Sequence, residues 1–484
     1  MKLYSINILS IILLIMSSFS VFAQERSGNY LDSRIGDTKN ETYEALLYHA
    51  DKEWLYDFDT KSPFEGITIS SGTFERDKTF FMSSPQSMKW NTSKGASLLF
   101  NANVTLEKSW PNNYYLTLGM FQEDVPKRDD KRVFKVELLS VTGDVIISRD
   151  INMHRGGWNI LCSDLKLPST VTVDKVRITQ ISGVSGAVLL DNFMISAFQN
   201  NNIIFMANGT AEIGNAELTM DKANNYPETV LTEDEKQAFL SIAEKVIPLP
   251  EKINQISSEK LQEYKEFHDF YNIVSHGEYA SGKNPLYYWR SVTSEVTNLF
   301  IHYVQNEKLC KKLKEIGKAW YQTEDAIQKK ELSIIMTDLI RLAVTFGDMP
   351  NPWYNGRGFA EGGVYYAKDL LQEAGLLDRV TTLIMQQYGV DLVLFNDQKW
   401  DNPLGGLKGP LGPEFFWQAT ADHLNTTSKS MILSVLVGAN TPEKARNLKR
   451  FKSWLDNIAL TYSPGVDGTL KPDGSWFHHW GESL

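Results

Sequence analysis

The chain has 484 residues, of which 42% are hydrophobic and 22% are charged. This composition excludes an intrinsically disordered chain, and the length suits roughly two to three folded domains. The formal net charge of −10 argues against a general affinity for nucleic acid or anionic membranes, although a local basic groove for an acidic polymer stays open.

The first 23 residues have the features of a signal peptide. Lys2 supplies a positive charge, Ile6–Ile15 form an apolar core, and Val21 and Ala23 occupy the small-residue cleavage positions. The apolar run is shorter than the roughly 18–20 residues that a membrane span needs. We therefore expect cleavage after Ala23, a secreted or periplasmic mature protein, and no membrane span.

A β-rich pattern occupies residues 24–205. The stretches "DKVRITQI" and "GAVLLDNFMISAF" are rich in β-branched residues, and "KRVFKVELLSVTGDVIISRDINM" predicts two strands around a turn at Thr142–Asp144. These features predict a β-sandwich of the jelly-roll, galactose-binding-like kind. Asp59 and Asp191 lie near its first and last strands, where carboxylates suit a Ca²⁺ ion; solvated surface acids are the alternative.

A polar linker over residues 206–231 separates this part from a helical pattern over residues 232–484. Thr232 and Glu235 have the spacing of a capping box, and Thr441 followed by Pro442 is a typical helix start. Helical periodicity recurs in "SEKLQEYKEFHDFYNIV" and "ELSIIMTDLIRLAVTF". Helix pairs joined by long loops predict an α/α toroid, with a plain α-solenoid as the alternative.

Long loops rich in Gly and aromatic residues are the candidate binding segments, because structureless loops of more than about 12–15 residues are uncommon unless functional. They cover residues 276–290, 346–363, 396–426 and 471–484.

The second of these loops concentrates groups that suit an acidic sugar. Arg357 can pair with a carboxylate or sulfate, the Asn355 amide can donate to a carboxylate, and Trp353 and Tyr354 offer rings for stacking. Asn425, at a helix start in the third loop, is either a ligand or a cap. A purely structural role for these loops is the alternative.

The final loop contains a turn signal at Pro472–Gly474, followed by Trp476 and two adjacent histidines, His478 and His479. Two successive side chains of an extended segment point in opposite directions, so that one histidine can face a cleft while the other packs.

The segment from His423 to Gly481 resembles the catalytic toroid of chondroitin sulfate ABC lyases, in polysaccharide lyase family 8. The similarity rests on the Asn-Thr helix start, a long helix pair and the pattern "DGTLKPDGSWFHHWG"; "GGWNILCSDL" and "VLLDNFMIS" are similar to the family's N-terminal sandwich. The resemblance implies β-elimination at the uronic acid of chondroitin sulfate, dermatan sulfate or hyaluronan.

The resemblance implies that the catalytic histidine is His479 and that His478 is its non-catalytic neighbour. Asn355 falls about where ABC-type enzymes carry a histidine, which favours carboxylate neutralisation by an amide. The family's Tyr would lie seven residues after His479, and its Arg and Glu further on, beyond Leu484. We therefore expect a truncated form with an incomplete active site and negligible turnover.

Two other classes of function stay open. One is a non-catalytic polysaccharide-binding protein that retains the sandwich and half of a cleft. The other is a glycoside hydrolase, which would need two carboxylates roughly 5–10 Å apart, and the loops supply Glu278, Glu361, Asp397 and Glu414. No organic cofactor is expected.

Overall fold

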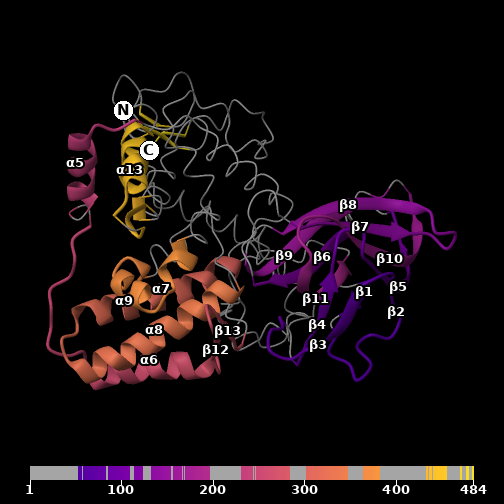
Figure 1. Ribbon diagram of the computed structural model, residues 1–484, viewed down its shortest axis with the longest axis horizontal. Helices are drawn as coiled ribbons and strands as arrows, with labels where there is room; N and C mark the ends of the chain where they lie inside the picture. Colours follow the sequence, from indigo (N-terminus) through magenta and orange to yellow (C-terminus); the bar gives the residue numbers. More distant parts are fainter. Residues whose placement is uncertain are drawn as a thin grey trace, which may run out of the picture.

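The structure is a computed structural model, shown in Figure 1. It describes residues 53–56, 58–82, 85–108, 114–123, 132–153, 156–165, 167, 169–196, 230–243, 245, 247–283, 301–346, 363–381, 432–433, 435–438, 440–454, 469–470, 476–478 and 482–483. None of the helices in these ranges is both long enough and apolar enough to cross a membrane.

Two antiparallel sheets form the N-terminal part and confirm the predicted β-sandwich. The first sheet has the order β3–β4–β11–β6–β9, with β1 also paired to β11. Its strands are β1 Trp54–Tyr56, β3 Thr73–Asp77, β4 Ser87–Thr92, β6 Tyr114–Gln122, β9 Gly157–Leu165 and β11 Gly186–Ser196. The second sheet has the order β2–β5–β10–β7–β8, with strands β2 Ile67–Ile69, β5 Ser97–Leu106, β7 Arg132–Leu139, β8 Val145–Met153 and β10 Val171–Ser182.

The sandwich core lies between these sheets and explains the sequence alternation. On β10, Val176 and Ile178 are buried in it, while Arg177 between them is half-buried on the other face and bonds Glu137 of β7 at 2.7 Å. Burial of each such aliphatic side chain contributes about 1.5–3 kcal/mol. The predicted turn between β7 and β8 is also present, with Gly143 at φ +83°.

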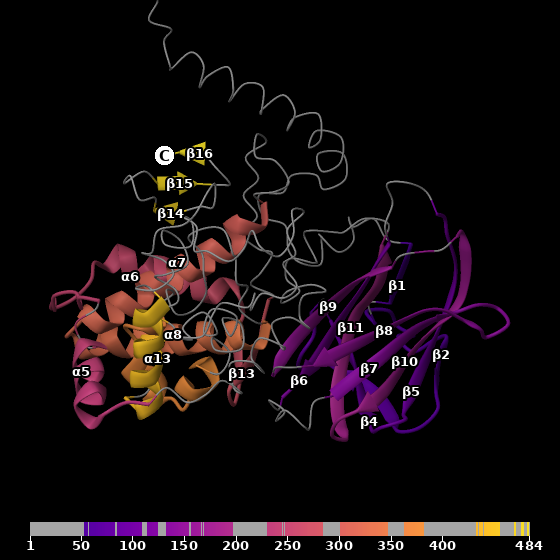
Figure 2. The same ribbon diagram turned by 90° about the horizontal axis from the view of Figure 1, so that it is seen from above.

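Part of the outer face of the first sheet, on β6, β9 and β11, is covered by the helical part. Phe121 and Leu189, which alternate with the inward-facing Met120 and Leu190, join Trp158 in a second apolar cluster that continues into the helices. The sandwich is therefore packed against the helical part on this side (Figures 1 and 2).

The described helices are α5 Glu233–Ala243, α6 Ser258–Phe270, α7 Ile301–Gln322, α8 Ala326–Phe346, α9 Lys368–Glu373 and α13 Pro442–Trp454. The predicted capping box is confirmed: the Glu235 N–H donates to Thr232 Oγ1 at 3.1 Å, and the Thr232 N–H donates to the Glu235 carboxylate at 3.0 Å. Helix α13 begins at Pro442, as predicted. Both views show α5 beside α13, although about 200 residues separate them along the chain (Figures 1 and 2).

The helical part also contains small sheets. β12 Val274–His276 pairs with β13 Tyr279–Ser281 as a hairpin. The prediction of a loop over residues 276–290 was therefore wrong for residues 276–281. β14 Thr469–Leu470, β15 Trp476–His478 and β16 Glu482–Ser483 form a three-stranded sheet. Helix α8 packs on α6 and α7, but the described helices do not establish a ring, so the toroid stays a prediction.

Candidate functional site

Most of the predicted site residues lie outside the part of the chain that the structure describes. These residues are Trp353, Tyr354, Asn355, Arg357, Asn425 and His479. Their grouping into one cleft therefore stays a prediction.

The C-terminal sheet fixes the backbone at Trp476–His478, which includes one of the two predicted histidines. Trp476 is the Cα partner of Leu470, and His478 is the partner of Glu482. The backbone is thus extended up to His478, and the strands before and after the Pro472–Gly474 turn signal pair antiparallel, as a hairpin requires.

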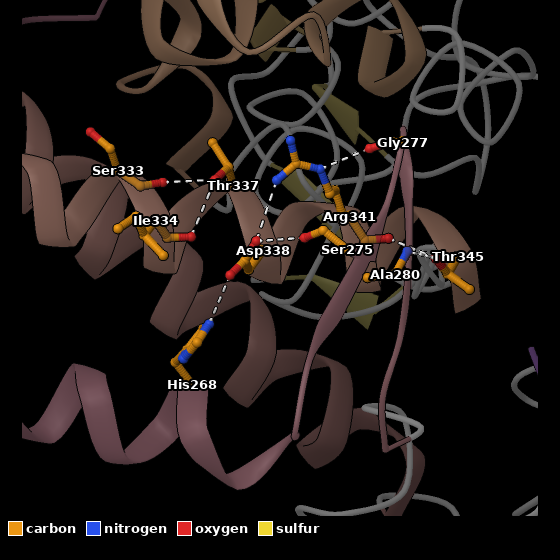
Figure 3. Close-up of polar contacts among 10 residues, drawn as sticks. All are labelled: His268, Ser275, Gly277, Ala280, Ser333, Ile334, Thr337, Asp338, Arg341 and Thr345. Carbon is orange, nitrogen blue, oxygen red and sulfur yellow. Dashed lines mark hydrogen bonds and ion pairs between the residues drawn. The ribbon is translucent and has the colours of Figure 1, made fainter. Parts of the chain in front are cut away.

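A polar cluster around Asp338 is the best-defined group of ionisable and hydroxyl side chains among the described residues (Figure 3). Asp338 lies on α8. Its Oδ2 is 3.1 Å from Nε2 of His268 on α6, and its Oδ1 accepts a hydrogen bond of 2.9 Å from the Ser275 hydroxyl on β12. Arg341, one turn further along α8, is 3.3 Å from the same Oδ1 and also donates to the Gly277 carbonyl at 2.9 Å.

The cluster forms where a charged residue interrupts the apolar run of α8. Leu339, Ile340 and Leu342 beside it are fully buried, whereas the Asp338 side chain is 18% exposed. A carboxylate held this close to an apolar core requires partners, and α6 and β12 supply them. The sequence signal was the Asp338–Arg341 pair inside "ELSIIMTDLIRLAVTF", which the helical periodicity alone did not reveal.

The electrostatics of the cluster favour an ion pair. The hydrogen bond to Asp338 raises the pKa of His268 above its ordinary value, against the opposing effect of burial. Burial alone would raise the pKa of Asp338, but the bonds from His268 and Ser275 outweigh it and hold that pKa below its ordinary value. Both groups are thus charged over the range between the two values.

The geometry of this cluster is that of a structural anchor. Ser275 donates to Asp338 and not to His268, so the histidine is not placed to take a proton from the serine hydroxyl. The side chains of His268, Ser275 and Arg341 instead all contact the Asp338 carboxylate and so join α6, β12 and α8.

The carboxylates considered for a hydrolase do not form a described pair. Glu278 binds Arg379, whose Nε donates to its carboxylate at 2.6 Å. Glu361, Asp397 and Glu414 lie outside the described residues. The distance between two catalytic carboxylates, which a glycosidase requires, is thus not defined among the described residues.

The predicted Ca²⁺ ligands occupy the sandwich. Asp191 is fully buried, and its two carboxylate oxygens accept backbone N–H bonds of 2.7 Å from Met82 and 2.8 Å from Asn192. These bonds account for its burial without a cation. No cluster of three or more His, Cys, Asp or Glu residues suited to a metal was found within the described ranges, and the Ca²⁺ site, with Asp59, stays a prediction.

Comparison with protein families finds a match in the C-terminal part of the chain. Residues 414–482 match the family model described as "Lyase, catalytic", and this segment includes α13 and most of the three-stranded sheet. The chain is also similar to the chondroitin sulfate ABC exolyase of Bacteroides thetaiotaomicron, with 32% identity over 127 residues, or 25% of this chain. The match covers 11% of that relative's length.

Solved structures similar to the chain include carbohydrate-binding modules. The CBM22-1 xylan-binding domain of Paenibacillus barcinonensis Xyn10C matches with 13% identity and a TM-score of 0.24, over 30% of this chain and 94% of that domain. A family 11 carbohydrate-binding module from Clostridium thermocellum matches with 9% identity and a TM-score of 0.22, over 30% of this chain and 95% of that one.

Proposed function

We propose that the protein is a glycosaminoglycan lyase, which cleaves chondroitin sulfate, dermatan sulfate or hyaluronan by β-elimination at the uronic acid. The observation that carries this proposal is the match of residues 414–482 to a lyase catalytic family, because that segment contains Pro472–Gly474 and His479. The similarity to a chondroitin sulfate ABC exolyase supports the choice of substrate class.

The reaction defines what the site must supply. The proton on C5 of the uronic acid leaves, the bond between C4 and its glycosidic oxygen breaks, and a C4–C5 double bond forms. Neutralisation of the carboxylate makes the C5 proton more acidic, a base takes that proton, and an acid protonates the leaving oxygen.

We assign these roles to the residues that the sequence singles out. His479 takes part in the proton transfer, and the Asn355 amide donates to the uronate carboxylate. Arg357 pairs with a carboxylate or sulfate of the polymer. The rings of Trp353, Tyr354 and Trp476, together with Asn425 and His478, bind the neighbouring sugars.

The remaining expectations are part of the same proposal. Residues 1–23 direct export, residues 24–205 form the sandwich domain, residues 206–231 form the linker, and residues 232–484 form the catalytic α/α toroid. A Ca²⁺ ion near Asp59 and Asp191 would serve the sandwich alone.

The test is incubation of the 484-residue chain with chondroitin sulfate, at high protein concentration, beside His479→Ala and His478→Ala variants. Binding is measured by calorimetry and cleavage by the ultraviolet absorbance of the conjugated double bond. We expect salt-sensitive binding by all three proteins. We expect absorbance growth only just above background, detectable at this high protein concentration, with the parent chain and with His478→Ala, and none with His479→Ala.

Other results would contradict the proposal. Tight binding with no absorbance growth from any of the proteins favours the non-catalytic binding protein. Reducing ends released without absorbance growth indicate a hydrolase. The absence of binding to chondroitin, dermatan and hyaluronan alike would exclude the substrate class.

A further inference from the structure

The β12–β13 hairpin bridges the two parts of the molecule. On its sandwich side, the Tyr279 hydroxyl donates to the Glu123 carbonyl, and the Tyr279 ring packs edge-on against Phe121 at 5.5 Å between ring centres. On its helical side, the Ala280 N–H donates to Thr345 Oγ1 of α8 at 2.8 Å. The hairpin is thus held by both parts at once.

The hairpin is attached to α6 at a point fixed by His268. This residue lies in the last turn of α6, three residues before Tyr271, which is fully buried. The Tyr271 carbonyl then accepts a bond of 2.8 Å from the N–H of Lys283, just after β13. Any loosening of the end of α6 therefore acts directly on both ends of the hairpin.

The geometry of His268 requires a proton on each ring nitrogen. Nδ1 is 3.0 Å from Oδ1 of Asp269, and Nε2 is 3.1 Å from Oδ2 of Asp338. A neutral imidazole carries only one N–H, so its other nitrogen would direct a lone pair at a carboxylate oxygen. Only the imidazolium satisfies both contacts, and the C-terminal end of a helix favours that cation further.

The other charged groups around His268 have partners of their own, and Arg341 shares Asp338 with it. On α6, Lys265 binds Glu331 of α8 at 2.9 Å. On α8, Arg341 binds Asp338 and the Gly277 carbonyl, and on β12 the Nε2 of His276 is 3.0 Å from the Ser281 hydroxyl. Among these groups, His268 is therefore the histidine that lies between α6 and α8 with both ring nitrogens directed at carboxylates.

We propose that the protonation state of His268 controls how tightly the junction of α6 and the β12–β13 hairpin packs on α8. It thereby controls how firmly the hairpin joins the helical part to the β-sandwich. Protonated His268 joins Asp269 and Asp338 across the junction. When the proton leaves, one contact becomes repulsive and the other loses its charge assistance. Arg341 keeps the hairpin attached, so the result is loosening rather than detachment.

The direction of the pH response follows from the raised pKa of His268. The stabilisation of the junction by protonated His268 is fully present below the ordinary histidine pKa of about 6.5, and it is lost as pH rises through the raised pKa. The loosening therefore occurs above the ordinary histidine pKa, as pH rises through the raised pKa of His268.

The experiment is hydrogen exchange of the backbone amides of residues 268–281 at about pH 5.5 and about pH 8.5, expressed as protection factors so that the intrinsic pH dependence of exchange is removed. We expect a severalfold fall in protection at the higher pH in the parent chain. His268→Gln should show low protection with no such fall. The matched control, His276→Gln, removes a histidine from the same hairpin and should keep the fall.

A second variant preserves the test if His268→Gln does not fold. Asp269→Asn leaves the His268–Asp338 contact in place and removes one attracting charge, so the midpoint of the pH response should move to lower pH. An equal fall in His268→Gln and the parent chain, a fall lost in His276→Gln, no fall in the parent chain, or an unmoved midpoint in Asp269→Asn would each overturn the proposal.

Discussion

Asp338 is the residue on which α6, β12 and α8 depend for their mutual position. Three side chains, His268, Ser275 and Arg341, direct hydrogen-bond donors at its two oxygens. Removing such a carboxylate is costly in free energy, because its partly buried hydrogen-bond donors would lose their acceptor without regaining their full hydration.

We expect Asp338→Ala to lower the free energy of unfolding by about 2–3 kcal/mol, because His268 and Ser275 lose their shared acceptor. The measurement is urea-induced unfolding at neutral pH. The control is Glu331→Ala on the same helix, which removes a partly exposed ion pair with Lys265 and should cost at most about 1 kcal/mol. Equal losses in the two variants would contradict the role assigned to Asp338.

At the scale of elements, the Thr345 hydroxyl on α8 makes two hydrogen bonds, one of which holds the β12–β13 hairpin. Thr345 Oγ1 accepts from the Ala280 N–H at 2.8 Å and donates to the Arg341 carbonyl at 2.9 Å. Thr337 lies on the same helix and only donates, to the Ser333 carbonyl at 2.9 Å and the Ile334 carbonyl at 3.2 Å.

This difference predicts unequal effects of two identical substitutions. Thr345→Val leaves the buried Ala280 N–H without an acceptor and should cost about 1–3 kcal/mol, whereas Thr337→Val should cost about 0.5 kcal/mol or less. Chemical unfolding measures both losses. If Thr337→Val proves as costly as Thr345→Val, the hairpin bond does not contribute as we describe.

The elements that the sequence predicts well are those governed by local rules. The capping box at Thr232 and the helix start at Pro442 depend on neighbouring residues alone, and both are found. The hairpin at residues 274–281 was missed because its strands are three residues long and its stability comes from α8 and the sandwich rather than from its own sequence.

At the scale of the whole molecule, the sandwich and the helical part meet through direct backbone contact. Gly157, at the start of β9, has φ +85°, and a Cβ atom there would lie 2.6 Å from the Val344 carbonyl oxygen and 2.7 Å from that of Thr345. The close approach of β9 to α8 therefore depends on a residue without a side chain.

We expect Gly157→Ala to weaken this interface by about 3 kcal/mol or more, and thermal unfolding should change from one transition toward two. Gly143→Ala is the matched control: Gly143 has φ +83°, but open space surrounds its Cβ position, so it should cost only about 1–2 kcal/mol. A similar loss and a single transition in both variants would show that the contact does not couple the two parts.

The same interface explains why the sequence predicts the sandwich but not its attachment. Phe121 and Leu189 alternate with core residues, and an apolar side chain on the second face of a strand does not reveal what covers it. The Asp338 cluster joins residues up to 70 positions apart, which no local pattern connects. The predicted cleft residues 353–357, Asn425 and His479 lie outside the described residues, so this explanation does not extend to them.

The most direct test of the lyase proposal is the mass of the products released from chondroitin by the 484-residue chain. Elimination adds no water, so the product masses should sum to the mass of the substrate. The fragment on the reducing side of the broken bond should carry the C4–C5 double bond, in the uronate at its new non-reducing end. Products whose masses sum to the substrate plus one water would show hydrolysis and would contradict the account.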